Sequence, residues 1–228
     1  MKHWILESRI HVLVGHYGSG KTEVALNMAE VLGKHGQLFA MVDLDVVNPY
    51  FRSRECREMV EGGGGRIVAS SQACTDADIP SVPAEVRAIF DDRNQRGILD
   101  VGGDPSGARV LAGYRTMIER EKARVVCVIN ASRPLTGTAD AAVRYIREIE
   151  AACGLKVGGI IHNTHLCNQT TIEAIRDGIR MAERVGRITG IPVICHSVEE
   201  KFAKEVGVSR HKLLLLQLYM KKPWERRD

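Results

Sequence analysis

The stretch Val12-Leu13-Val14-Gly15-His16-Tyr17-Gly18-Ser19-Gly20-Lys21-Thr22 decides the fold. Its last eight residues match the spacing G-x-x-x-x-G-K-[ST], which is typical of a loop that binds phosphate groups. The apolar run from Ile10 to Val14 precedes this loop, and an amphipathic pattern over residues 22–35 follows it. Because the motif requires a strand before the glycines and a helix after them, both neighbours favour a genuine phosphate-binding loop.

Each residue type in the loop has a physical task. Glycine lets the backbone wrap around an anion without a Cβ clash. Successive N–H groups then point at the anion, and the positive end of the following helix adds to their field. Lys21 is expected to reach the β- and γ-phosphates, and the Thr22 hydroxyl to bind Mg²⁺. The predicted nucleotide-binding residues are Gly15, His16, Tyr17, Gly18, Ser19, Gly20, Lys21, Thr22, Gly103 and Asn163.

Two further strand ends carry carboxylates. Asp43 and Asp45 close the second apolar run, and Asp100 closes the third. In a parallel sheet these ends lie beside the phosphate loop. Thr22, Asp43 and Asp100 are therefore the predicted magnesium ligands, the acids acting through water. Lys21, Asp43 and Asp45 are the predicted catalytic residues; Asp45 is expected to position the attacking water, although Asp43 and Asp45 are interchangeable at this stage.

The run Leu99-Asp100-Val101-Gly102-Gly103 also has the pattern D-x-x-G. The N–H of Gly103 is positioned by this spacing to sense a γ-phosphate and to switch the following loop, residues 104–107. Binding of a nucleoside triphosphate with magnesium is therefore predicted to change the conformation of this segment.

Short β-branched runs alternate with segments of helical period along the chain. This alternation predicts an α/β fold with three layers, a mostly parallel twisted sheet flanked by helices. The whole of residues 1–228 is expected to be one nucleotide-binding domain with a small excursion at about 61–95. That excursion contains the glycine run Gly62 to Gly65, expected to be a flexible connector, and a short strand candidate, Arg66 to Ala69.

Composition excludes several classes of protein. The chain has 228 residues, of which 44% are hydrophobic and 26% charged, so it is neither disordered, collagen-like nor a disulfide miniprotein. A net charge of +4 without clustering predicts no nucleic-acid binding. No apolar run approaches about 20 residues, and the first residues lack a signal-peptide pattern. With six scattered cysteines and no C-x-x-C, these features predict a cytoplasmic protein without stable membrane association.

Together these motifs resemble the P-loop NTPases of the signal-recognition, MinD and BioD class, most of all its MinD/ParA-like branch, the CobQ/CobB/MinD/ParA nucleotide-binding domain. The similarity covers nearly the whole chain, since Ile161-His162-Asn163 and Gly190-Ile191-Pro192-Val193 fit the last strands of that branch. The resemblance implies ATP as ligand with Mg²⁺, slow ATP hydrolysis, and a nucleotide-dependent homodimer that acts as a switch for a client protein, here unknown. It also implies that Asn163 hydrogen-bonds to adenine.

The sequence departs from that branch at one position. His16 stands where ParA-like loops carry a signature lysine that reaches across the dimer. The segment from Gly18 to Thr22 is instead similar to accessory GTPases that deliver nickel, but the stretch Asn163-Thr164-His165-Leu166 lacks their guanine-reading Lys and Asp. Without that carboxylate, ATP is favoured over GTP. A GTP-dependent metal-delivery accessory protein and a non-hydrolysing ATP-dependent scaffold remain as alternatives.

Three other clusters qualify as candidates. Arg52, Arg54 and Arg57 form either a solvated helix face or a switch segment in which Arg52 or Arg54 replaces the missing lysine. The residues of the second cluster have side chains that suit a soft metal or line a base pocket: His162, His165, Cys167, Cys195 and His196. The segment from Lys212 to Lys222 is a candidate for an amphipathic C-terminal helix, but Leu213 to Leu216 is apolar on all faces, which favours packing on the core or on a partner.

Overall fold

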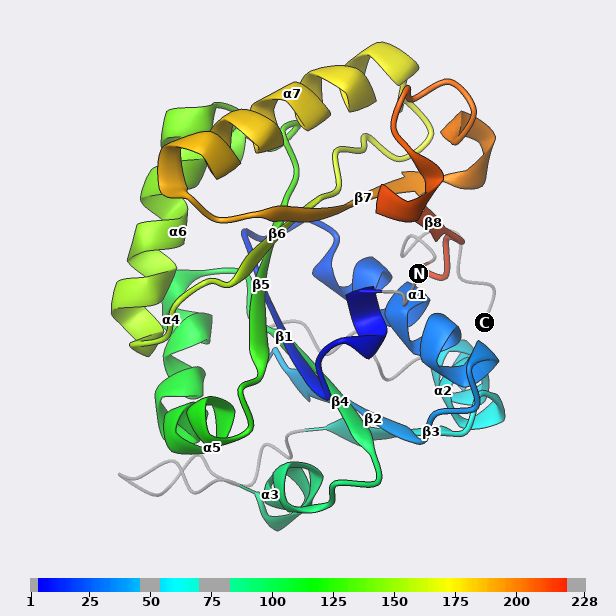
Figure 1. The fold of residues 1–228 in the computed structure, drawn as a ribbon, viewed down its shortest axis with the longest axis vertical. Coiled ribbons are helices and arrows are strands. Elements are labelled where there is room, and N and C mark those ends of the chain that lie inside the picture. Colours follow the sequence, from blue (N-terminus) through cyan, green and yellow to red (C-terminus); the bar gives the residue numbers. More distant parts are fainter. Residues whose placement is uncertain (1–3, 46–53, 70–82, 221–228) are drawn as a thin grey trace.

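The computed structural model describes residues 4–45, 54–69 and 83–220 (Figure 1). The strands are β1 (Ile10–Val14), β2 (Phe39–Leu44), β3 (Gly65–Ala69), β4 (Arg96–Val101), β5 (Arg124–Ile129), β6 (Gly159–His162), β7 (Val193–Glu199) and β8 (Leu213–Leu216). The α-helices are α1 (Lys21–Lys34), α2 (Arg54–Gly62), α3 (Ala84–Asp91), α4 (Pro105–Ala108), α5 (Arg115–Arg120), α6 (Ala139–Cys153) and α7 (Ile172–Thr189). No helix in this described part is both long and apolar enough to cross a bilayer.

The described strands form one sheet in the order β3-β2-β4-β1-β5-β6-β7-β8, and every neighbouring pair is parallel. This arrangement confirms the predicted α/β fold. The chain moves to one side of β1 through β2, β3 and β4, and to the other side from β5 onward. Such a reversal of strand order opens a crevice at the carboxyl ends of the strands, where ligands of open α/β sheets bind.

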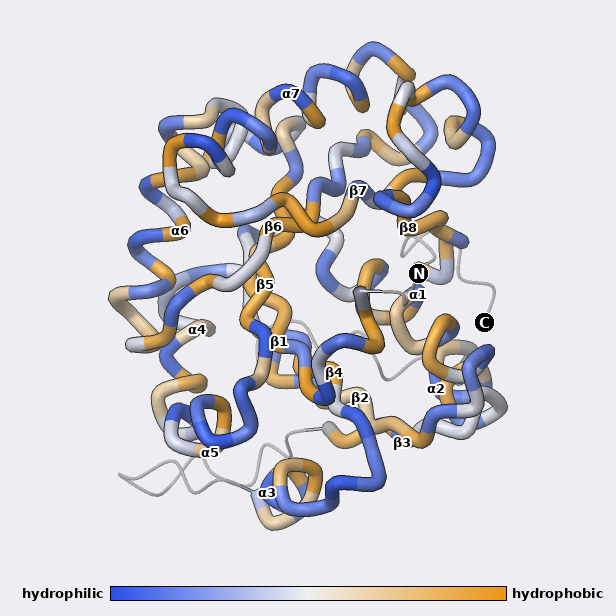
Figure 2. Tube along the Cα trace, viewed as in Figure 1, coloured by the Kyte–Doolittle hydropathy of each residue, from blue (hydrophilic) through white to orange (hydrophobic). Residues whose placement is uncertain are grey.

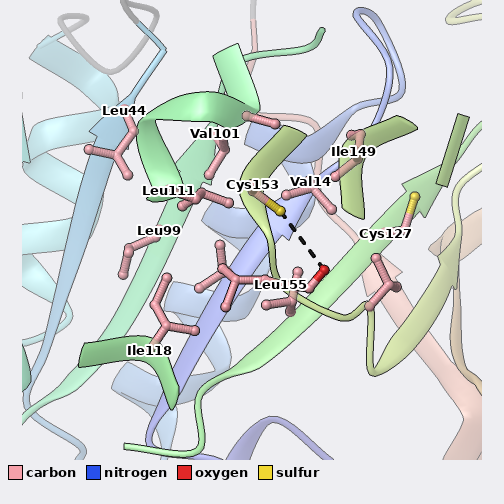
Figure 3. Close-up of a cluster of buried hydrophobic side chains, with 14 of the residues drawn as sticks. Val14, Leu44, Leu99, Val101, Leu111, Ile118, Cys127, Ile149, Cys153 and Leu155 are labelled. Carbon is pink, nitrogen blue, oxygen red and sulfur yellow. Dashed lines mark hydrogen bonds between the residues drawn. The ribbon is translucent and has the colours of Figure 1, made fainter. Parts of the chain in front are cut away.

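Helices cover both faces of the sheet (Figure 1). The helices α1 and α2 and the 3-10 helix η1 (Trp4–Leu6) pack on one face, and α3 to α7 contribute to the core on the other. The hydropathy trace shows mainly apolar central strands and helices of mixed character, as expected when a sheet is buried on both faces (Figure 2). Figure 3 shows part of the core on the face that α3 to α7 cover. There Val14, Leu99 and Cys127 of the strands meet Leu111 and Ile149 of the covering helical segments.

The prediction of a C-terminal helix is wrong. Leu213–Leu216 forms β8, which pairs in parallel with β7. Four consecutive leucines have no polar face, and here their side chains go alternately to two different apolar clusters. A run with apolar residues on both faces suits a buried parallel strand, whereas a surface helix needs one polar face.

The segment expected as an excursion contains an edge strand of the same sheet. β3 pairs with β2, from Phe39 opposite Gly65 to Asp43 opposite Ala69. The glycine run is the turn from α2 into β3, in which the N–H of Gly63 bonds to the Met59 and Val60 carbonyls. The polar stretch after β3, residues 70–82, lies outside the described residues.

Candidate nucleotide-binding site

The loop between β1 and α1 has the backbone geometry that its glycines predict. Gly18 and Gly20 have φ angles of +72° and +87°, in the left-handed region that favours glycine. Gly20 is the N-cap of α1, so the helix begins at Lys21. Among the described residues, the amides of Gly18, Gly20, Lys21 and Thr22 have no backbone acceptor. A loop of free N–H groups at a helix N-terminus is suited to bind an anion.

Lys21 lies folded over this loop. Its Nζ donates to the carbonyl oxygens of Gly15, at 3.0 Å, and of His16, at 3.3 Å. The side chain is buried, and burial lowers its pKa, while the charges of Asp100 and Asp45 oppose that effect. A buried ammonium group that is held only by carbonyl oxygens is well placed to exchange them for phosphate oxygens.

Thr22 and Asp100 are joined by a short hydrogen bond. The Thr22 hydroxyl donates to Asp100 Oδ2 at 2.6 Å, and the other oxygen, Oδ1, is buried without a hydrogen-bond partner among the described residues. Burial raises the pKa of Asp100 to about 6, against the opposing effects of Lys21 and Thr22. A hydroxyl beside an unpartnered carboxylate oxygen offers the hard oxygen ligands that Mg²⁺ prefers, so these residues fit the predicted ion.

The acids of β2 lie next to Asp100. Asp43 stands opposite Asp100 in the register of β2 and β4 and is buried. Its Oδ1 accepts the N–H of Asp45 at 3.0 Å, which turns the chain at the end of the strand. Asp45 lines the cavity beside the loop. The structure therefore brings Asp43, Asp45, Asp100 and Thr22 together, and it places Asp45 toward the space where a phosphate would lie.

Gly103 connects the D-x-x-G segment to the phosphate loop. Its carbonyl oxygen accepts the N–H of Tyr17 and the hydroxyl of Tyr145, both at 2.8 Å. A Cβ atom at residue 103 would stand 2.7 Å from the Tyr17 Cα, so only glycine allows this approach. Asp104 then caps α4 by accepting the N–H of Gly107. The phosphate loop at Tyr17 is thus in direct contact with the segment that precedes α4.

A cavity of about 530 Å³ opens beside the loop. Its polar wall comes from the phosphate loop and from the carboxyl ends of β5, β6 and β7, and its apolar wall from α7 and the C-terminal segment. The lining includes Lys21, Thr22, Glu23, Asp45, Arg133, Asn163, His165, Ser197, Glu199, Leu216, Leu218 and Met220. The cavity therefore has the phosphate-binding loop at one end and enough volume beyond it for a nucleoside.

Asn163 is buried between the phosphate loop and β7. Its Nδ2 donates to the Ser19 carbonyl oxygen at 2.8 Å, and its Oδ1 accepts the Ser197 hydroxyl at 2.9 Å. Both ends of the amide are therefore engaged within the protein. In this arrangement Asn163 positions the loop, while its predicted contact with adenine stays a prediction.

Comparison with solved structures identifies the fold that this geometry represents. The Signal Recognition Particle 54 kDa protein from Aeropyrum pernix K1 in complex with GDP aligns with a TM-score of 0.55 at 22% identity, over 83% of this chain and 41% of that one. FtsY from Thermotoga maritima aligns with a TM-score of 0.57 at 19% identity, over 85% and 62%. FlhF complexed with GTP and Mg²⁺ aligns with a TM-score of 0.52 at 15% identity, over 84% and 66%. The fold is that of a P-loop NTPase.

The likeness to these structures concerns the P-loop NTPase fold alone, because every identity is below 25%. The chain spans less than two thirds of the length of each of the three. No protein-family model matches the chain, and no curated protein matches it either.

Two charged residues of the candidate site were not anticipated from the motifs. Arg133, after β5, donates from Nε to the Gly18 carbonyl oxygen at 2.7 Å. Glu199, the last residue of β7, lines the cavity and pairs with Lys201 at 2.7 Å. Like the aspartates, both residues lie at or just after the carboxyl end of a parallel strand, where the strand ends surround the site. That position is the sequence feature by which they could have been found.

The cluster of histidines and cysteines does not form a metal site in the described part of the chain, where no group of three or more His, Cys, Asp or Glu side chains is placed to hold an ion. His162 is buried beside His196, with ring centroids 5.5 Å apart, and burial lowers the pKa of His162 to about 3. His165 lines the cavity, and Cys167 is exposed.

The arginine cluster after β2 is described only in part. Arg52 and the side chain of Arg54 lie outside the described residues. Arg57 pairs with Glu61 at 3.3 Å on the exposed surface of α2, which is the solvated-face arrangement. Arg57 is thus the one arginine of this cluster with a described side chain, and the hypothesis that Arg52 or Arg54 replaces the missing lysine falls on side chains outside the described residues.

Proposed function

We propose that this chain is a nucleotide-state switch that binds ATP with Mg²⁺ and hydrolyses it slowly. Two observations carry the proposal: within the described part of the chain, the phosphate-binding loop has free amides, and the Thr22–Asp100 contact leaves one carboxylate oxygen without a partner. Both features lie at one end of the same cavity, which is lined by Lys21 and Thr22. Together they suit the phosphates of a nucleoside triphosphate and its ion.

Phosphate binding, ion binding and orientation of the attacking water are assigned to different residues by their chemistry. The loop amides and Lys21 hold the phosphate oxygens, because they supply aligned donors and a positive charge. Thr22, Asp43 and Asp100 would hold Mg²⁺. When bound, this ion would neutralise part of the negative charge of the phosphates. Asp45 lines the cavity and would orient the attacking water by accepting a hydrogen bond from it.

The switch is supported by the contact between Tyr17 and Gly103. A γ-phosphate that pulls on the loop would move the D-x-x-G segment through this hydrogen bond. A MinD/ParA-like membership, a nucleotide-dependent homodimer and a client protein that reads the moved segment are further parts of the proposal. His16 in place of the signature lysine predicts that any dimer does not activate hydrolysis through residue 16.

Calorimetric titration with ATP and GTP, each with and without Mg²⁺, tests the proposal together with single-turnover phosphate release. We expect ATP to bind with Mg²⁺ and to be hydrolysed, Lys21→Ala to weaken binding by about 100-fold, and Asp45→Ala to bind ATP but release little phosphate. Wild-type protein that binds ATP without releasing phosphate would be the non-hydrolysing scaffold. Wild-type protein that binds neither nucleotide would contradict the proposal.

GTP is the second candidate because of Glu199. The sequence motif lacks a carboxylate for the N1–H and N2–H donors of guanine, but Glu199, at the end of the neighbouring strand, is among the residues that line the cavity. A carboxylate accepts two parallel hydrogen bonds from guanine, whereas adenine offers a single amino group. The binding constants of the two nucleotides, measured side by side, decide between them.

A further inference from the structure

Arg133 occupies the space that glycine leaves at residue 18. Its Nε donates to the Gly18 carbonyl oxygen at 2.7 Å. A Cβ atom at residue 18 would stand 2.9 Å from that Nε and 3.0 Å from Cζ, so any side chain there would displace the guanidinium. Gly18 therefore has two roles: it permits the left-handed turn of the loop, and it provides the surface on which Arg133 rests.

The turn that carries Arg133 is rigidly bonded. Asn130 is fully buried, and its Nδ2 donates to the His165 carbonyl oxygen at 3.1 Å. The Thr136 hydroxyl and the Arg133 N–H both donate to the Asn130 carbonyl oxygen, at 3.1 and 3.2 Å. Pro134 follows and restricts Arg133 to an extended backbone, observed at φ −99° and ψ 129°. The guanidinium is thus held in place before any ligand arrives.

The remaining donors of Arg133 have no partner among the residues that the structure describes. A guanidinium carries five N–H groups, and the bond to Gly18 uses one. Within the described ranges, no carboxylate pairs with Arg133 and no acceptor takes the other four. Arg133 lines the same cavity as Lys21. Burial lowers the pKa of His165, and the positive charge of Arg133 lowers it further. An unpaired fork of donors beside a phosphate loop is arranged for phosphate oxygens.

We propose that Arg133 is an arginine finger that the chain supplies to its own nucleotide, a role that rests on the proposed function above. Water forms a bond to the γ-phosphorus while the bond to the β–γ bridging oxygen breaks. The electron pair stays on the departing diphosphate, and the water proton passes to the released phosphate. Arg133 donates to the oxygens on which negative charge grows. It takes the place expected for Arg52 or Arg54 and compensates for His16.

This assignment has a consequence for assembly. A signature lysine acts from a second copy, so its effect depends on protein concentration. An arginine on the same chain acts in every protomer. Hydrolysis per protomer is therefore expected to stay constant over a wide range of protein concentration, including concentrations at which the chain is monomeric.

The test compares Arg133→Ala, Arg133→Lys and the control Arg144→Ala, an exposed arginine of α6. Single-turnover phosphate release is measured with ATP and GTP, and the affinity for ADP and GDP is measured separately. We expect Arg133→Ala to slow phosphate release by about 100-fold or more and to change diphosphate affinity by less than about threefold. Arg133→Lys is expected to recover little, because it lacks the planar fork. Free guanidinium added to Arg133→Ala is expected to restore part of the rate.

Several results would overturn the assignment. Unchanged release by both Arg133 variants would do so, and so would an equal loss of triphosphate and diphosphate affinity, since that indicates a role in shaping the loop. A wild-type rate that rises with protein concentration would place the activating group on a second copy. If wild-type protein binds nucleotide but never hydrolyses it, Arg133 does not act as an arginine finger, whereas the proposal that the chain binds nucleotide stands. Wild-type protein that binds no nucleotide would instead remove the proposed function itself.

Discussion

The side-chain amide of Asn27 forms two hydrogen bonds to the backbone of Gln217. Its Nδ2 donates to the Gln217 carbonyl oxygen at 2.9 Å, and its Oδ1 accepts the Gln217 N–H at 2.8 Å. One turn earlier on α1, the Glu23 carboxylate accepts the N–H groups of Tyr219 and Met220 at 2.7 and 3.1 Å. The helix that begins at Lys21 therefore holds the C-terminal segment 217–220 along the wall of the cavity.

Replacing Glu23 should release that segment. We expect Glu23→Ala to speed amide hydrogen exchange at Tyr219 and Met220 by about tenfold or more, because two backbone donors lose a charged acceptor worth about 1.5–3 kcal/mol. Glu173→Ala is the matched control, since Glu173 also lies in the first turn of a helix but is exposed. Exchange at 219 and 220 that is equally slow in wild type and Glu23→Ala would contradict the clamp.

We expect Asn163, which lines the cavity, to contribute also to the stability of the fold. Asn163→Ala leaves the buried Ser19 carbonyl oxygen without the Asn163 donor, and we expect a loss of about 1–3 kcal/mol in the free energy of unfolding. The Ser197 hydroxyl loses one of its two acceptors and keeps the His162 carbonyl oxygen. Asn163→Asp should cost more, because a carboxylate would face the Ser19 carbonyl oxygen. Urea denaturation measures both, with the exposed Asn168→Ala as control. Equal stability of Asn163→Ala and wild type would show that the bridge contributes nothing.

His11 should make the fold sensitive to acid. Its ring is buried, its Nε2 lies 3.0 Å from the Ile5 carbonyl oxygen, and burial lowers its pKa from 6.5 to about 4. Arg124 and Arg96 lower the pKa further, while Glu7 raises it.

Below pH 6.5 the unfolded chain takes up a proton that the folded chain refuses, so stability falls as pH drops toward 4. We expect this group to cost about 2 kcal/mol between pH 8 and pH 5. His11→Gln keeps a donor for the Ile5 carbonyl oxygen and should make the free energy of unfolding depend less on pH. Urea denaturation between pH 8 and pH 5 measures this dependence. His35→Gln, at an exposed ring, should leave it unchanged. An undiminished slope in His11→Gln would assign the acid sensitivity to other groups.

Glu199→Gln should separate the two bases. We expect GTP affinity to fall by about tenfold or more, because a glutamine amide cannot accept both guanine donors. ATP affinity should change by less than about threefold. Isothermal titration with both nucleotides checks this, and the exposed neighbour Glu200→Gln serves as control. If both affinities stay as in wild type, Glu199 takes no part in base recognition.

The sequence predicted the parts of the site that depend on strand ends and on short spacings. The loop from Gly15 to Thr22 and the acids Asp43, Asp45 and Asp100 lie together because parallel strands bring their carboxyl ends to one edge. The same rule, applied to β5 and β7, indicates Arg133 and Glu199, but no motif drew attention to them.

Other features depend on partners far apart in the chain. Both bonds of Asn163 reach residues that spacing cannot identify, Ser19 and Ser197. The four leucines of β8 have no polar face, which disfavours a surface helix, but so short an apolar run shows no period that would identify a strand. Only the pairing of His196 with Leu213 and the residues that follow decides for the strand.

The cavity joins residues that are far apart in the order of synthesis: the phosphate loop follows the first strand of the sheet, whereas the wall formed by Leu216, Leu218 and Met220 begins with the last strand described. A chain that has been translated only as far as β7 therefore lacks this wall. We expect such a chain to bind nucleotide more weakly than a chain that includes β8, because it lacks the apolar contacts of Leu216, Leu218 and Met220.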